Sequence, residues 1–151
     1  MISPERLRKQ PHCAGAPDEL LRKVAMLADE RPFRKGETLF EEGMPAKHLL
    51  FLEAGEVNIV FTLGGGHKVT VGTVAAGDVM AWSALLEPNQ LTASGVARTD
   101  VVCIAIEGEG LRRLCLENPA YGYTMMTQVA KTLRDRLTAT RVQLAAAIEP
   151  T

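Results

Sequence analysis

The chain has 151 residues, of which 46% are hydrophobic, so its length suits one domain that can bury its own core. Its 17 basic and 18 acidic residues nearly cancel, which argues against a surface built for nucleic acid or an anionic membrane. No apolar run approaches the roughly 20 residues that span a bilayer, and Cys13, Cys103 and Cys115 fit no closed disulfide framework. These features predict a soluble, cytoplasmic protein with reduced thiols.

An amphipathic helix is predicted over residues 18–31. Pro17 and Asp18 suit the start of a helix, and Pro32 is expected to end it. Charged residues fill one face of this helix. The other face carries apolar residues at helical spacing, namely Leu20, Leu21, Val24, Leu27 and Ala28.

Residues 33–106 alternate between apolar and polar side chains in short runs that glycines separate. Gly64-Gly65-Gly66, for example, supplies the tip of a predicted hairpin. Short strands with glycine-rich turns predict a mainly β fold with flanking helices, an antiparallel jelly-roll barrel. The strand-like runs cover residues 33–43, 48–51, 57–61, 68–74 and 91–106.

The stretch from Gly77 to Pro88 interrupts these strands. It opens with a Gly-Asp turn, reaches Ser83, a residue type favoured at helix N-caps, and leaves room for one or two helical turns before Pro88. A short helix here would point free backbone N–H groups toward an anion such as phosphate. The alternative is a tight turn that closes a β-structure, with Trp82 packed in the core.

Two helices are predicted over residues 108–147. The first ends near residue 117, and Asn118-Pro119 gives a cap residue followed by proline at the start of the second. At about 1.5 Å per residue the second helix is ~40 Å long, which is longer than a small barrel needs. We expect a parallel homodimer seam, and the alternative is a helix lying on its own barrel. The seam would use Met126, Val129, Leu133, Leu137, Thr140 and Leu144.

No catalytic or metal site is predicted. His12, His48 and His67 lie far apart in the sequence and show no paired ligand spacing. Cys103 lies in an apolar alternating strand, as expected for an inert buried thiol. Since the sequence also lacks a nucleophile-elbow or Walker pattern, we expect that the protein is not an enzyme.

The order of these elements and several short motifs resemble a known family. The chain from about Asp18 to Leu144 is similar to the cyclic-nucleotide-binding domain of catabolite-activator (Crp/Fnr-type) regulators. This resemblance implies a single domain over residues 1–151, in which the short helix after Gly77-Asp78 would be the phosphate-binding cassette. The motifs are Lys35-Gly36-Glu37, Glu42-Gly43, residues 52–57 and Gly77-Asp78.

The resemblance also implies where a ligand would lie. Family members that bind cyclic AMP hold the ribose with a Gly-Glu pair before the cassette helix and the phosphate with an Arg-Ser or Arg-Thr pair after it. Counting along the chain places these pairs on Ala81-Trp82 and Leu91-Thr92, so both charged anchors are missing. A hydrogen bond to a charged group contributes roughly 1.5 to 3 kcal/mol, so cyclic AMP binding is expected to be weak or lost. The expected contact positions are Ala81, Trp82, Ser83, Ala84, Leu91 and Thr92.

Two side chains could replace the missing anchors. Arg98 could swing into the pocket and bind phosphate, and Trp82 could stack on a base or another planar ligand. The alternatives are an Arg98 that faces solvent and a Trp82 that only packs in the core.

Two functions are compatible with the sequence. The first is a stand-alone sensor that binds a small ligand, with cyclic nucleotides among the candidates, and signals through the long helix to a protein partner or across the dimer. The second is a ligand-free scaffold for dimerisation and protein contacts. Regulators of this family continue into a DNA-reading helix-turn-helix, and this sequence ends at Thr151 without one, so no direct DNA binding is expected.

Overall fold

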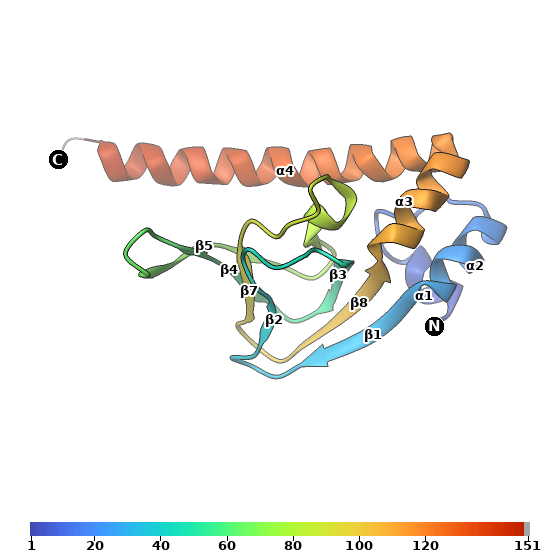
Figure 1. The fold of residues 1–151 in the computed structure, drawn as a ribbon, viewed down its shortest axis with the longest axis horizontal. Coiled ribbons are helices and arrows are strands. Elements are labelled where there is room, and N and C mark those ends of the chain that lie inside the picture. The colour runs from blue at the N-terminus through green and yellow to red at the C-terminus, as the bar shows by residue number, and fades with distance from the viewer. Residues whose placement is uncertain (150–151) are drawn as a thin grey trace.

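Two antiparallel sheets of four strands each form the barrel of the computed structural model, which describes residues 1–149 (Figure 1). One sheet has the strand order β1-β8-β3-β6 and the other the order β2-β7-β4-β5. The predicted mainly β jelly-roll class with flanking helices is therefore confirmed. The strands are β1 Ala28–Phe33, β2 Thr38–Phe40, β3 His48–Ala54, β4 Val57–Thr62, β5 Lys68–Val74, β6 Val79–Met80, β7 Ser94–Ala97 and β8 Val101–Glu107.

Helices precede, interrupt and follow the strands. The short α1 was not predicted from the sequence, and the Ser3 side chain caps it by accepting a hydrogen bond from the Arg6 N–H at 3.3 Å. Asn118 separates the last two helices, and its side chain donates to the Leu114 carbonyl at 3.1 Å, so it closes the end of α3. The helices are α1 Pro4–Arg8, α2 Asp18–Met26, the 3-10 helix η1 Trp82–Leu85, α3 Gly108–Glu117 and α4 Pro119–Ile148.

The predicted helix over residues 18–31 is too long. α2 ends at Met26, and Ala28 begins β1, which pairs with β8 along its whole length. Pro32 does not break this strand, because β1 lies at the edge of its sheet, where a missing N–H can face away from the ladder. Leu27 and Ala28 fit helical spacing but also fit the start of a strand, so periodicity alone could not locate the boundary.

The core is centred on β3 and β8. Most side chains of both strands are buried, including Phe51 and Ile104, and the same cluster takes in Leu21 of α2, Leu111 of α3 and Met125 of α4. The second sheet is less enclosed, and most of β5 is exposed or half-buried. The helices therefore anchor the first sheet and leave the second sheet closer to solvent.

α4 runs along the barrel, and its C-terminal half extends over the β4–β5 hairpin (Figure 1). Its 30 residues span about 45 Å at the usual rise of an α-helix. Tyr121, Met125 and Val129 are buried, whereas residues 137–149 are all exposed. The first half of α4 thus belongs to the packed domain, and the second half presents a free surface. Within residues 1–149, none of the helices has the length and apolar character needed to cross a membrane.

Candidate functional site

The segment between β6 and β7 forms the candidate site. Ala81 follows β6 in the left-handed region, at φ 55°, and turns the chain into η1. A residue with a side chain is strained in this region, which indicates that the surroundings hold the turn in place. The predicted length of one or two helical turns is confirmed, since η1 is one 3-10 turn. The predicted cap is wrong, because Ala81 and not Ser83 holds the N-cap position and Ser83 lies inside the turn.

Fewer backbone N–H groups are free at this turn than the sequence predicts. The Ala84 N–H donates to the Ala81 carbonyl at 3.1 Å, so it is used inside the turn. Ala84 is also fully buried. Since a single 3-10 turn carries little of the dipole of a longer helix, η1 by itself makes a weak anion site.

Two side chains that the sequence analysis missed fix the end of η1. The Asn89 side-chain amide donates to the carbonyls of Ser83, Ala84 and Leu86 at 2.9, 3.2 and 3.0 Å. Arg112 of α3 donates to the same Ala84 carbonyl. Asn89 lies in the left-handed region at φ 58°, which asparagine tolerates better than most residues, so an asparagine after Pro88 was the available signal. These bonds tie η1 to α3.

A small cavity lies beside η1 and has a volume of about 30 Å³. That is room for one or two water molecules, not for a nucleotide. The structure brings five of the six predicted contact positions around this cavity and leaves Ala84 buried behind them. No charged side chain lines it. The lining residues are Phe40, Ile59, Met80, Ala81, Trp82, Ser83, Leu91, Thr92 and Ala93.

Arg98 does not reach the cavity. It follows β7, its side chain is 57% exposed, and its Nη1 lies 3.6 Å from Glu56 Oε2. Its backbone N–H also donates to the Glu56 carbonyl at 2.9 Å. This arrangement agrees with the alternative of a solvent-facing side chain, and the suggested phosphate contact by Arg98 stays a prediction.

The predicted dimer stripe on α4 divides into two groups. Val129 is 1% exposed and packs in its own domain, so it cannot contribute to a seam without rearrangement. Leu133 is half-buried, while Met126, Leu137 and Leu144 are 37%, 49% and 59% exposed. Thr140 is exposed as well. The exposed positions of the stripe are therefore Met126 and those beyond Leu133.

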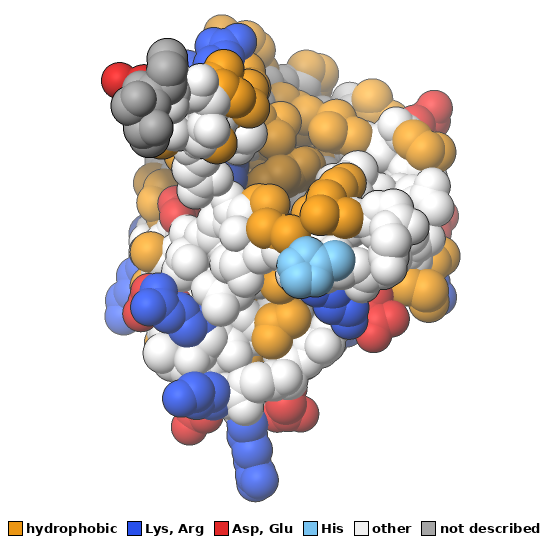
Figure 2. Space-filling model, turned by 90° about the vertical axis from the view of Figure 1, so that its left-hand side faces the viewer, with side chains coloured by type: hydrophobic (Ala, Val, Ile, Leu, Met, Phe, Trp, Pro, Cys, Tyr) orange, Lys and Arg blue, Asp and Glu red, His pale blue; other side chains and the backbone are white. Residues whose placement is uncertain are grey.

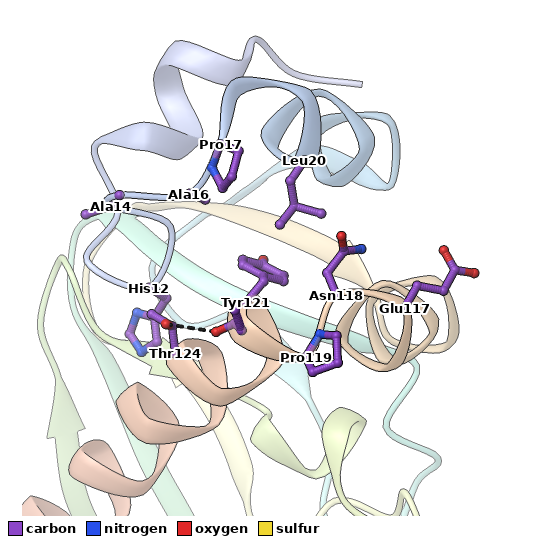
Figure 3. A pocket seen from close by; sticks show the side chains of 12 residues that line it. His12, Ala14, Ala16, Pro17, Leu20, Glu117, Asn118, Pro119, Tyr121 and Thr124 are labelled. Carbon is purple, nitrogen blue, oxygen red and sulfur yellow. Dashed lines mark hydrogen bonds between the residues drawn. The ribbon is translucent and has the colours of Figure 1, made fainter.

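A larger cavity, of about 400 Å³, lies away from the cassette, between the segment before α2 and the start of α4 (Figure 3). His12, Pro17, Leu20 and Tyr121 contribute to its walls. The ring nitrogens of His12 and the hydroxyl of Tyr121 are buried and have no partner among the described residues. Burial lowers the pKa of His12, which favours the neutral ring, and this ring stacks on Phe51 at 5.2 Å between centroids.

The histidines do not gather into a metal site. Within residues 1–149, no group of three or more His, Cys, Asp or Glu side chains is placed to hold a metal ion. His48 instead lies 3.1 Å from the Arg31 guanidinium, and burial and this cation lower its pKa. The buried Cys103 thiol has its pKa raised to about 12 by desolvation, so it is protonated and unreactive at neutral pH.

Comparison with known families and proteins gives a consistent result. Residues 30–118 match the family model described as the cyclic nucleotide-binding domain. A CRP-like cAMP-activated global transcriptional regulator of Mycobacterium tuberculosis is 24% identical over 102 residues, which are 68% of this chain and 46% of that regulator. The chain thus spans about half the length of this curated relative.

Two solved structures resemble the chain over most of its length. One, from Geobacter metallireducens GS-15, is described as a cyclic nucleotide-binding protein; it is 34% identical, with a TM-score of 0.79 and coverage of 91% of this chain and 99% of that one. The other is the regulatory domain of Toxoplasma gondii PKA with cAMP, at 19% identity and a TM-score of 0.73, covering 87% of this chain and 48% of that one. At that identity the second likeness concerns the fold alone.

Proposed function

Because the chain belongs to the cyclic nucleotide-binding domain family, we propose that it is a regulatory sensor that binds a nucleotide-like ligand beside Trp82 and signals through α4. The observation that carries this proposal is the convergence of Ala81, Trp82, Ser83, Leu91 and Thr92 on one cavity. One relative gives further support, since it is named as a cAMP-activated regulator. This relative is named as a regulator, which favours signalling over catalysis.

Ligand entry requires the cavity to open. Its present volume of about 30 Å³ is far below the ~300 Å³ or more of a typical ligand pocket. Trp82 is half-buried and packs against the edge of the core, so its indole is the side chain best placed to move and to stack on a base. The ligand would stabilise an open arrangement that the free protein rarely adopts.

We further propose that the second half of α4 pairs with α4 of a second copy. Figure 2 views the molecule from the end of α4 and shows apolar side chains gathered near the helix end and the β4–β5 hairpin. Exposed apolar side chains occur on both elements, and contiguous ones on a monomer commonly mark a contact surface. They are Phe61, Leu63, Val71, Leu137, Val142, Leu144 and Ile148.

A ligand-free scaffold is the second candidate. The small apolar cavity without a charged lining residue favours it, because nothing in that lining would hold a phosphate strongly. In this case the barrel would only support dimerisation and protein contacts through α4.

Trp82 is the single tryptophan, so its fluorescence tests the sensor directly. The protein would be titrated with cyclic AMP, cyclic GMP and cyclic dinucleotides, with thermal unfolding measured in parallel. We expect saturable fluorescence change and a raised melting temperature at micromolar concentrations of at least one of them. No response up to millimolar concentrations would reject the sensor and leave the scaffold.

A further inference from the structure

Arg136 of α4 is a half-buried arginine without an anionic partner. It continues the inward face of the helix, and among residues 1–149 it makes no ion pair or side-chain hydrogen bond. Its Nη1 lies against β5, 2.6 Å from the position that a Cβ on Gly72 would occupy. The inward face consists of Tyr121, Met125, Val129, Thr132 and Arg136, at steps of three or four residues.

The guanidinium lies on the cavity side of the hairpin. Gly72 is paired directly with Ile59 of β4, and directly paired residues of antiparallel strands point to the same face of a sheet. Ile59 lines the small cavity together with Trp82. Since Arg136 approaches Gly72 from the direction of its missing side chain, it shares that face with Ile59.

The electrostatics of this arginine favour an incoming anion. Burial lowers the pKa of Arg136, and the charge of Asp78 partly offsets this effect. Asp78 itself is exposed, and within residues 1–149 its carboxylate makes no ion pair with the guanidinium. A partly desolvated guanidinium with five donors gains most from a bidentate partner such as a phosphate or carboxylate. If only the aliphatic part of the Arg136 side chain were needed for packing, its guanidinium could remain in water, as it usually does.

We infer that Arg136 binds the anionic group of the ligand that enters beside Trp82. This inference rests on the proposed function and narrows it to ligands that carry a phosphate. Arg136 would supply from α4 the positive charge that the cavity lining lacks. The same contact would join α4 to the barrel, so ligand binding and the helix signal would depend on one side chain.

The inference is tested with wild type, Arg136→Gln and the control Arg134→Gln, whose side chain is 68% exposed on the same helix. Each is titrated with cyclic AMP, a cyclic dinucleotide and inorganic pyrophosphate at constant ionic strength, with Trp82 fluorescence and thermal unfolding as readouts. We expect Arg136→Gln to lose about 10- to 100-fold in affinity and Arg134→Gln to bind like wild type. Melting without ligand reports whether each variant is folded.

The outcomes separate this inference from the proposed function. Pyrophosphate that stabilises wild type but not Arg136→Gln, with no nucleotide response, would support the anion site and reject the nucleotide sensor. A nucleotide that binds wild type and Arg136→Gln equally would overturn the role of Arg136 and keep the sensor. Binding of neither probe to wild type would overturn both.

Gly72→Ala is a second variant in case Arg136→Gln fails to fold. The added methyl group would lie within 2.6 Å of Nη1, so the guanidinium must move while its charge stays. We expect weaker binding of the same probes, with the melting temperature of the free protein nearly unchanged. Unaltered affinity in Gly72→Ala would contradict the inferred geometry.

Discussion

The two halves of α4 share one helical pattern but meet different surroundings. In the first half, Tyr121, Met125 and Val129 are buried against the domain. In the second half, Leu137 and Leu144 are 49% and 59% exposed. Similar apolar side chains therefore stabilise the fold in one half and stay available to a partner in the other. Contact with the rest of the domain therefore decides which apolar residues of α4 are buried.

The largest expected effect comes from placing a charge in the packed half. Val129→Asp would bury a carboxylate with no partner, because Val129 is 1% exposed. We expect the free energy of unfolding to fall by about 3 to 5 kcal/mol. Urea denaturation followed by circular dichroism, at low protein concentration, measures this change.

Leu144→Asp is the matched control in the other half. Leu144 is 59% exposed, so its substitution should change the free energy of unfolding of the isolated domain by less than about 0.5 kcal/mol. Equal losses in the two variants would show that the two halves do not differ in packing.

The next effect concerns self-association. Leu133→Asp would change both dimerisation and the stability of the domain, because Leu133 is half-buried and packs partly within its own domain. Leu137→Asp affects the exposed half alone, and a carboxylate in an apolar helix seam should weaken a homodimer at least about tenfold. Sedimentation equilibrium measures the dissociation constant, and circular dichroism checks that α4 remains helical.

Met44→Asp controls for the general effect of an added surface charge. Met44 is 54% exposed and lies outside α4, in the loop after β2, so we expect its variant to associate like wild type. Wild-type protein that stays monomeric at high concentration would remove the homodimer proposal. Equal weakening by both variants would point to a net-charge effect.

Much of the fold was predictable, because local signals agree with the long-range packing. Asn118-Pro119 marks the break between α3 and α4, and glycine-rich turns separate short alternating strands. The end of α2 was not predictable from periodicity. Leu27 and Ala28 continue the helical spacing, whereas the pairing of β1 with β8 decides the conformation there.

The sequence predicted where the candidate site lies but not which charged side chains lie near it. Counting along the chain pointed to Trp82 and Leu91, which the structure brings to one cavity, although ligand binding there stays a prediction. Arg98 lies outside this cavity and pairs with Glu56, a contact that nothing in the local sequence indicates. The sequence did not point to Arg136, the anion contact inferred above, because its position depends on the close approach of α4 to Gly72, a contact between residues 64 positions apart.

The smallest expected effect is a pH dependence at the packed half of α4, where His12 lines the cavity beside Tyr121. Burial lowers the pKa of His12 below its ordinary value of about 6.5, so the unfolded chain binds a proton more readily than the folded one. Stability should therefore fall as the pH drops below about 6.5 toward the folded pKa, by at most about 1.4 kcal/mol per pH unit for this group.

His12→Phe removes this titration and keeps an aromatic ring against Phe51. We expect a shallower loss of stability than in wild type between pH 6.5 and pH 5, measured by urea denaturation at each pH. His48→Gln is needed as a control, because the pKa of His48 is lowered too. An unchanged slope in His12→Phe would assign the acid sensitivity elsewhere. A reduced slope would show that protonation of His12, which lines one cavity with Tyr121 of α4, contributes to the acid sensitivity of the fold.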